Sequence, residues 1–293
     1  MNDERKTVEE LIVRYELEPT LRDVYVEGEF DAFLLRWFFH DSDMQNVCVY
    51  EIGTVEISHD LLAEARATNN NKGRVIALAH KLQQALGDEC RQVTFVVDKD
   101  FDHLLQHNPS TRLLLITDYS CMEMYLFNQW QLEKFCTLVL QATILSIPRL
   151  LKQMGTILQE LYLLRFNNIK NSLGYEWMSF IRCCELRARQ EIIFNKEDFL
   201  VKYLHKNRAI ARKVEVLSFI DFCRPQLASD HRMNANGHDF FELLEWLSKQ
   251  LKPSCFRNSE AFRRAFLGCL ETSRIRGEPL FSKLLQWHAD GLA

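Results

Sequence analysis

Acidic residues stand at the ends of two apolar, strand-like runs of this sequence. Glu27 follows DVYV, and Asp98 follows VTFVV, with Asp100 and Asp102 close behind it in DKDFD. In an open α/β sheet, ligands bind outside the carboxyl ends of the strands, so these carboxylates are expected to converge. Carboxylates that gather at one point repel one another and require a cation between them. Hard oxygen ligands favour Mg²⁺ or Mn²⁺, so we predict a divalent metal site at this edge.

Two further acidic residues lie close to these runs, and each allows two interpretations. Asp31 follows Glu27 by four residues. It either completes the metal site or occupies the first turn of a helix, where an acidic side chain is stabilising. Glu123 follows Ser120 by three residues, which is the spacing of a helix-capping box. The alternative is that Glu123 is another metal ligand, because its segment follows the fourth strand-like run.

Strand-like and helix-like segments alternate through the first half of the chain. Strands are predicted at 23–28, 47–52, 93–98 and 112–117. Their alternation with helices is typical of an α/β domain with a mainly parallel sheet. In the first intervening helix, one apolar stripe is expected to face the core, formed by Phe30, Phe33, Leu34, Trp37 and Phe38.

Beyond residue 130 the strand signals give way to long amphipathic stretches, with helix breaks expected at Pro148, Pro225 and Pro253. We therefore predict an α/β domain over residues 1–130 and an all-α domain over residues 131–293. The second domain is expected to serve nucleic-acid binding, dimerisation or both.

Composition limits the class of protein. The 293 residues are 47% hydrophobic and 26% charged, which is typical of a compact fold and not of a disordered chain. No run of 18 apolar residues occurs, and the charged N-terminus has no apolar signal segment, so we expect a cytoplasmic protein with no membrane contact. Nine cysteines without a CxxC pair argue against a disulfide scaffold or a zinc ribbon.

Charge is distributed unevenly along the chain. Residues 1–130 carry 12 Lys and Arg against 23 Asp and Glu, whereas the remainder carries 24 against 17. The segment 202–213 concentrates five basic residues, namely Lys202, Lys206, Arg208, Arg212 and Lys213. Such a run suits the phosphates of a nucleic acid. The alternative is an ordinary solvated helix face.

The segments VYVEGEFD, VVDKDFD and LLITDYSCMEMYL together resemble a Toprim domain over about residues 22–130. The spacing of Glu27 and Asp31, and of Ser120 and Glu123, is more similar to the Toprim domain of OLD-type nucleases than to that of primases or topoisomerases. The layout of the whole chain resembles the AriB-type Toprim effector subunits of the PARIS anti-phage defence systems.

This resemblance implies a metal-dependent endonuclease that uses two Mg²⁺ or Mn²⁺ ions. It implies Glu27, Asp98 and Asp100 as catalytic residues, with Asp31 and Glu123 completing the metal ligands. Asp102, Ser120 and His238 are further candidates. Related effectors often carry Lys at the position of His238, and the segment NGHD around it also suits the start of a helix.

The same resemblance implies a biological setting. An ATPase subunit of the defence system would hold the effector inactive, and a phage anti-restriction protein would trigger its release. The released effector would act as a homodimer on RNA, with tRNA as the expected substrate, and would stop translation.

Other functions are compatible with parts of the pattern. A Toprim endonuclease that cuts DNA and a Toprim domain retained only for binding both remain alternatives. The DxD sequence at Asp98 and Asp100 also occurs in phosphatases of the haloacid-dehalogenase type and in nucleotide-sugar transferases. Neither of these two classes accounts for Glu27.

Overall fold

The computed structural model describes residues 5–107, 109, 111–142, 146–188 and 191–291. The chain forms two compact units. The first comprises Met1–Lys99, His107–Asp118 and Glu271–Ala293, and the second comprises Asp100–Gln106 and Tyr119–Leu270. The single boundary predicted at residue 130 therefore differs from the observed division, because the end of the chain returns to the first unit.

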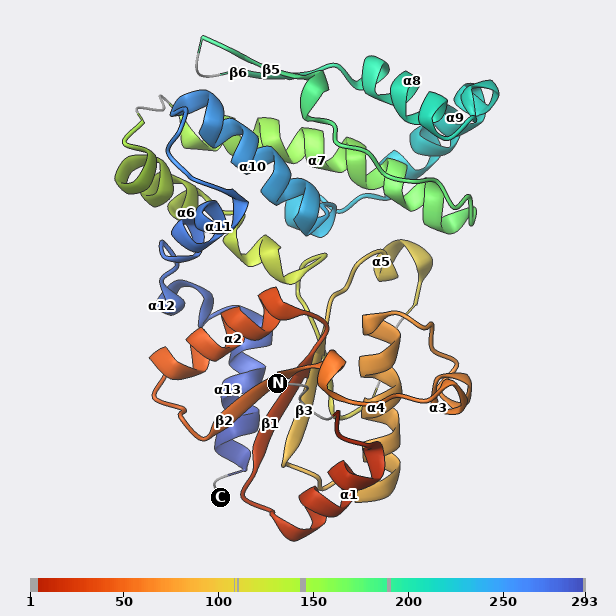
Figure 1. The fold of residues 1–293 in the computed structure, drawn as a ribbon, viewed down its shortest axis with the longest axis vertical. Coiled ribbons are helices and arrows are strands. Elements are labelled where there is room, and N and C mark those ends of the chain that lie inside the picture. The colour runs from red at the N-terminus through yellow and green to blue at the C-terminus, as the bar shows by residue number, and fades with distance from the viewer. Residues whose placement is uncertain (1–4, 108, 110, 143–145, 189–190, 292–293) are drawn as a thin grey trace. The chain divides into compact units, whose positions relative to one another are not determined.

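The first unit is built on a four-stranded sheet in the order β2-β1-β3-β4, in which all neighbouring strands are parallel (Figure 1). The strands are β1 (Arg22–Val26), β2 (Val47–Glu51), β3 (Val93–Val97) and β4 (Leu114–Ile116). All five residues of β1 and of β3 are buried, as expected for the central strands of a parallel sheet. The four predicted strands are confirmed.

Helices cover both faces of this sheet. They are α1 (Val8–Leu17), α2 (Glu29–Asp41), α3 (His59–Glu64), α4 (Asn71–Leu86), α12 (Thr272–Ile275) and α13 (Pro279–Asp290). Figure 1 shows α1 and α4 on one face, with α2 and α13 on the other. The face beneath α1 and α4 holds a continuous apolar core that includes Leu11, Tyr25, Leu78 and Phe95.

A buried carboxylate lies at the start of β1. Asp23 is fully buried, accepts a hydrogen bond from the Tyr15 hydroxyl at 2.9 Å and pairs with Arg14 at 3.5 Å. Burial raises the pKa of Asp23, whereas Tyr15 and Arg14 act in the opposite direction. These contacts join α1 to the sheet at the strand end opposite Glu27.

The C-terminal helix α13 belongs to the α/β unit, which the sequence did not predict. The ring of Phe281 packs 4.7 Å from that of Phe38 on α2, and the backbone amide of Leu280 donates to Asp118 Oδ2 at 3.0 Å. The predicted all-α region of 131–293 included this segment, but the sequence could not identify its partner, because the apolar face it packs against is more than 230 residues away in sequence.

The predicted apolar stripe of α2 is partly wrong. Phe33 and Trp37 are 51% and 44% exposed, whereas Leu34 and Phe38 are buried together with their neighbours Leu35 and Phe39 on the same helix. The buried face is thus rotated toward Leu35 and Phe39, since this face meets the sheet and α13.

The second unit is mainly helical. Its helices are α5 (Asp102–Leu105), α6 (Gln129–Lys134), α7 (Ile147–Lys170), α8 (Lys196–Lys206), α9 (Lys213–Cys223), α10 (Gly237–Leu251) and α11 (Ser259–Leu267). The predicted helix breaks are confirmed: Pro148 lies in the first turn of α7, Pro225 follows α9, and Pro253 follows α10. In the described part of the chain, no helix is both long and apolar enough to cross a bilayer.

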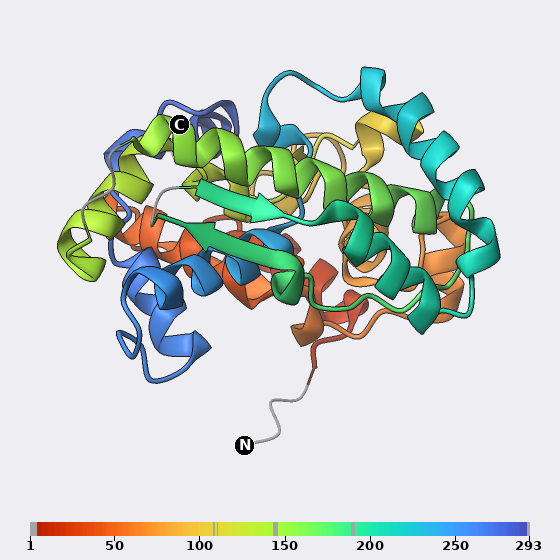
Figure 2. The same cartoon turned by 90° about the horizontal axis from the view of Figure 1, so that it is seen from above.

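An antiparallel hairpin corrects the prediction that residues 131–293 are all-α. Its strands are β5 (Cys184–Arg187) and β6 (Glu191–Phe194), with Leu186 opposite Ile192. Figure 2 shows the hairpin alongside α7. This segment falls within the region that was predicted to be all-α from its amphipathic pattern. The β-branched pair in EIIF favours a strand, and the backbone amide of Ile192 donates to Gln153 Oε1 of α7 at 3.3 Å.

Candidate functional site

The carboxyl ends of β1 and β3 meet through Glu27. Glu27 directly follows β1, and its Oε1 atom accepts a hydrogen bond from the backbone amide of Asp98, which directly follows β3, at 2.8 Å. Both residues are partly exposed. The predicted convergence of these two strand ends is therefore confirmed, because β1 and β3 are parallel neighbours in the sheet.

The Asp31 carboxylate lies at the start of α2. Its Oδ2 atom accepts a hydrogen bond from the amide of Gly28 at 3.2 Å, and the side chain is buried. This is the helix-initiating interpretation, since the bond satisfies an amide that the helix leaves unpaired. The assignment of Asp31 as a metal ligand stays a prediction.

Side chains that the sequence did not single out also reach this edge of the sheet. The Asn71 amide, in the first turn of α4, donates to the carbonyl of Glu27 at 2.9 Å. Its neighbour Lys72 donates from Nζ to the carbonyl of Lys99 at 3.3 Å. The signal that could have revealed them is the turn NNNKG, which places a lysine at a helix start after β2.

A close approach explains the glycine of that turn. Asn70 caps α4 through a 2.8 Å bond from the amide of Gly73. A Cβ atom at Gly73 would lie 1.9 Å from the carbonyl oxygen of Thr68. Only glycine allows the preceding loop to approach the helix this closely, so the position of Asn71 and Lys72 is fixed by backbone packing.

Lys99 is turned toward the end of β4. Its Nζ atom donates to the carbonyl of Asp118 at 2.5 Å, and its backbone amide donates to Thr117 Oγ1 at 2.9 Å. The Asp118 carboxylate, in turn, accepts from the first turn of α13. Lys99 therefore links the ends of β3 and β4.

The DKDFD segment does not continue as an extended strand. Asp100 has a left-handed backbone, with φ of 48°, a conformation that Asp adopts more readily than most residues. Its amide donates to the carbonyl of Ser120 at 2.7 Å, and its carbonyl accepts from the Tyr162 hydroxyl at 2.6 Å. Because of this turn, the side chains of Asp98 and Asp100 do not share a face through strand alternation, and the expected convergence of Asp100 with Asp98 is not supported by the backbone. Asp100 and Asp102 both belong to the second unit, and Asp102 is buried in α5.

Ser120 and Glu123 do not form the predicted capping box. The Ser120 hydroxyl lies 2.6 Å from the carbonyl oxygen of Ala235 and 2.9 Å from that of Arg232, and its single proton can be donated to either. The helix after it is a short 3-10 segment, Met122–Leu126, without a side-chain cap. Glu123 instead lies against the start of α10, where a Cβ atom at Gly237 would be 2.3 Å from its carboxylate oxygen. A carboxylate is stabilised at such a helix N-terminus.

The NGHD segment begins α10. Asn236 caps this helix by accepting from the backbone amide of His238 at 3.1 Å, and the His238 side chain is exposed. Asp239 is buried and receives two hydrogen bonds of 2.7 Å from Arg165 and one of 3.2 Å from the indole of Trp177. The helix-initiating interpretation of this segment is confirmed, and a catalytic role for His238 stays a prediction.

The basic residues of 202–213 lie in and between α8 and α9, and four of the five are paired with acidic side chains. The pairs are Lys202 with Asp198 (2.6 Å), Lys206 with Glu176 (3.4 Å), Arg212 with Glu215 (2.5 Å) and Lys213 with Glu197 (3.0 Å). The fifth, Arg208, follows α8 with φ of 53°. Local pairing reduces the positive potential of this surface, and its role in nucleic-acid binding stays a prediction.

The donor set at the sheet edge suits a hard cation. Glu27 and Asp98 both contribute carboxylates, and carboxylate oxygen is the donor that Mg²⁺ and Mn²⁺ prefer. Within the described part of the chain, no three His, Cys, Asp or Glu side chains are gathered as metal ligands. The structure thus brings together two of the five predicted ligands. Of the other three, Asp31 lies in the first unit at the start of α2, whereas Asp100 and Glu123 lie in the second unit.

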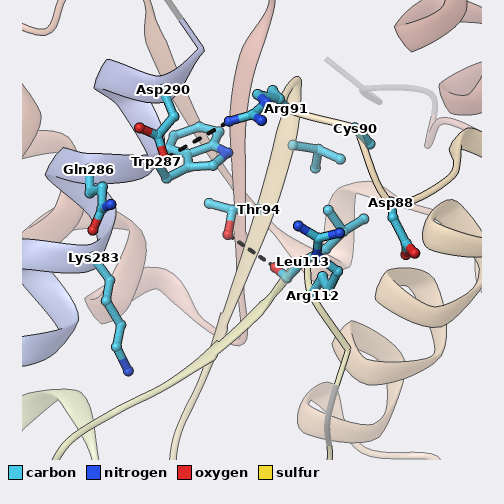
Figure 3. A pocket seen from close by; sticks show the side chains of 11 residues that line it. Asp88, Cys90, Arg91, Thr94, Arg112, Leu113, Lys283, Gln286, Trp287 and Asp290 are labelled. Atoms are coloured by element: carbon cyan, nitrogen blue, oxygen red, sulfur yellow. Dashed lines mark hydrogen bonds and ion pairs between the residues drawn. The ribbon is translucent and has the colours of Figure 1, made fainter.

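A cavity of about 210 Å³ lies at the opposite end of the strands, where β3 and β4 begin (Figure 3). Its lining includes three basic side chains, Arg91, Arg112 and Lys283, and two acidic ones, Asp88 and Asp290. Arg91 lies 3.9 Å from Asp290 across the cavity and 3.6 Å from Glu89. Because acidic side chains offset most of its positive charge, this cavity shows no clear preference for an anion.

Comparisons with known proteins leave the family of this chain open. The Toprim resemblance therefore rests on the segments around Glu27, Asp98 and Glu123 and on the geometry of the first two. No family model matches the chain, and no curated protein matches it in sequence.

Proposed function

We propose that this chain is a Toprim-type, metal-dependent endonuclease that cleaves RNA, with tRNA as its expected substrate. The observation that carries the proposal is the 2.8 Å hydrogen bond from the Asp98 amide to the Glu27 carboxylate. It joins the ends of two central parallel strands, which is where an α/β sheet holds its ligand. Neither a DxD phosphatase nor a DxD sugar transferase requires an acidic residue at the position of Glu27.

The chemistry follows from the two carboxylates. Two Mg²⁺ or Mn²⁺ ions held by these carboxylates would supply an activated water and offset the charge on the leaving oxygen. The Glu27 carboxylate, held in place by the Asp98 amide, would accept the proton of the attacking water. The Asp98 carboxylate would bind the metal, with Asp100, Asp31 and Glu123 proposed to complete the ligands.

The biological setting is proposed from the resemblance to PARIS effectors. In that setting an ATPase subunit holds the nuclease inactive, and a phage anti-restriction protein triggers its release. The released chain acts as a homodimer in the cytoplasm and stops translation by cutting tRNA.

The test is incubation of the purified chain with bulk tRNA and, separately, with plasmid DNA, with Mg²⁺ or with a chelator. Cleavage of tRNA is expected only with Mg²⁺. Glu27→Gln retains an oxygen that can accept from the Asp98 amide but removes the charge and the base. It should lower the cleavage rate by roughly 10³-fold, which is about 4 kcal/mol in the activation free energy.

Glu29→Gln is the matched control, because Glu29 is exposed in the first turn of α2, two residues from Glu27. It should cleave at the parent rate. Cleavage of plasmid DNA in place of tRNA would favour the DNA endonuclease, and binding without cleavage of either would favour a non-catalytic Toprim. Full activity of Glu27→Gln would exclude the proposed site.

A further inference from the structure

The helix that follows Glu27 carries two large aromatic side chains on its solvent face. Phe33 is 51% exposed and Trp37 is 44% exposed. They lie four residues apart on α2, which is about one helical turn, so the two rings share one face. A single exposed apolar residue is ordinary, but two large rings on one face form a patch of the kind that binds a partner.

An arginine and a histidine lie on the same face. Arg36 and His40 are both exposed, and together with Phe33 and Trp37 they occupy positions i, i+3, i+4 and i+7 of one stripe. The His40 ring lies 5.7 Å from the Trp37 ring. Arg36 donates from Nε and Nη2 to the carbonyl of Val49 at 3.1 and 2.7 Å, so β2 fixes the position of its positive charge. Aromatic rings interleaved with a cation suit a polyanion that carries flat bases.

The position of this stripe connects it to the candidate site. The helix α2 begins two residues after Glu27, at the carboxyl edge of the sheet (Figure 1). At 1.5 Å per residue, Phe33 lies about 6 Å along the axis from the first residue of the helix, and Trp37 lies about 6 Å further. A strand whose phosphate is held at Glu27 and Asp98 can therefore extend along α2 and place successive bases against the two rings.

Stacking on a protein ring requires a base whose own face is uncovered. In an RNA duplex the bases are stacked on one another, and a protein meets mainly phosphates and 2′-hydroxyls. In a loop or another single-stranded segment, the bases can turn outward and stack on aromatic side chains. The two rings of α2 therefore favour an unpaired segment of RNA over a duplex.

We propose that Phe33 and Trp37 stack against two unpaired bases of the RNA strand that is cut beside Glu27 and Asp98. The proposal rests on the nuclease function and adds to it the kind of substrate segment that the site recognises. An exposed aromatic face also suits a second protein chain, but the fixed charge of Arg36 and the continuity with the candidate site favour RNA.

The test compares single-stranded with double-stranded RNA. Phe33→Leu and Trp37→Leu are introduced separately into the inactive Glu27→Gln protein. Leucine is apolar and a good helix former but has no aromatic face. The affinity for a labelled single-stranded oligoribonucleotide, and for the same strand annealed to its complement, is measured by fluorescence anisotropy across a series of salt concentrations.

Each leucine variant should bind the single strand roughly tenfold more weakly, as for the loss of one stacked base. The affinity for the duplex should match that of the parent, because the duplex has no free base to stack. The slope of log K against log salt should not change, because neither variant removes a charge that meets a phosphate.

Trp37→Phe and Leu17→Ala are the matched controls. Trp37→Phe keeps an aromatic face and should retain most of the affinity for the single strand. Leu17 is 75% exposed on α1, and α1 is joined to the sheet at the strand end opposite Glu27. Leu17→Ala therefore removes exposed apolar surface from the same unit without changing the stripe, and its affinity should match that of the parent.

Three results would overturn the proposal. The first is parent affinity for the single strand in both leucine variants, and the second is equal weakening for single strand and duplex. The third is a change of molecular mass in solution with unchanged RNA affinity, which would assign the face to a protein partner.

The cleavage assay separates these results from a failure of the nuclease function. If the parent protein cleaves tRNA while both leucine variants bind like the parent, only the stacking proposal fails. If the parent protein cleaves neither tRNA nor DNA but the leucine variants lose affinity for the single strand, the nuclease function fails and the aromatic stripe remains an RNA-binding surface.

Discussion

The carboxyl edge of the sheet and the basic helices α8 and α9 use their charges in different ways. At the sheet edge, Lys72 and Lys99 donate to backbone carbonyls, and Glu27 accepts from a backbone amide. The basic side chains of α8 and α9 instead pair with carboxylates. The partner of Lys202 is four residues away in sequence, and the partner of Arg212 is three residues away.

This difference shows that a run of basic residues in sequence is not by itself a positive surface. A pair at i and i+4 forms within one helix and cancels most of its own field at a distance. At the sheet edge, backbone groups of neighbouring segments also hold the charged side chains, so the fold fixes the positions of those side chains. The sheet edge therefore has the stronger case as the centre of a reaction.

The largest expected effect comes from removing a carboxylate at the sheet edge. Removal of a carboxylate from the basic helices is the control. Asp98→Asn keeps the backbone amide that donates to Glu27 and removes the proposed metal-binding charge, so it should lower the tRNA cleavage rate by roughly 10³-fold. Asp221→Asn changes an exposed residue of α9 and should have no effect. The measurement is single-turnover cleavage in Mg²⁺, and equal rates for the two variants would remove the distinction between the regions.

The same distinction explains which parts of the fold were predictable from sequence. The apolar runs of β1 and β3 predicted buried parallel strands, and parallel neighbours necessarily end at the same edge, so Glu27 and Asp98 were brought together correctly. The return of α13 to α2 and the turn that leaves Asp100 outside the strand conformation depend on partners far away in sequence. Periodicity within a segment carries no information about such partners.

Lys72 was missed for a related reason. Its position at the sheet edge depends on the carbonyl of Lys99, 27 residues away, and on the close approach of Gly73 to Thr68. The basic run at 202–213 was identified because its residues are adjacent, but its pairing with Glu176 and Glu197 is set by the folded chain. The sequence thus shows where the charged residues are, but not the contacts in the folded chain that determine which of them are paired.

A smaller effect, on tRNA affinity, is expected when the acidic partners of the basic residues on α8 and α9 are removed. The double variant Glu197→Gln and Glu215→Gln removes the carboxylates that face Lys213 and Arg212. In the Glu27→Gln background, tRNA affinity should increase about fivefold and its salt dependence should steepen, because two cations become available to phosphates. Unchanged affinity in the anisotropy measurement would show that RNA does not approach this surface.

The smallest expected effect concerns stability. Asn71→Ala removes the bond to the Glu27 carbonyl, a contact across 44 residues. It should lower the free energy of unfolding by about 0.5–1 kcal/mol, a typical value for one partly exposed hydrogen bond.

Lys202→Met breaks an exposed pair within one helix, so its melting temperature should match that of the parent protein. The measurement is thermal unfolding followed by circular dichroism. Equal loss of stability in both variants would mean that the long-range contacts at the sheet edge hold the fold no more strongly than a local surface pair. Contacts other than the Asn71 hydrogen bond would then have to hold Glu27 in the position that the proposed mechanism requires.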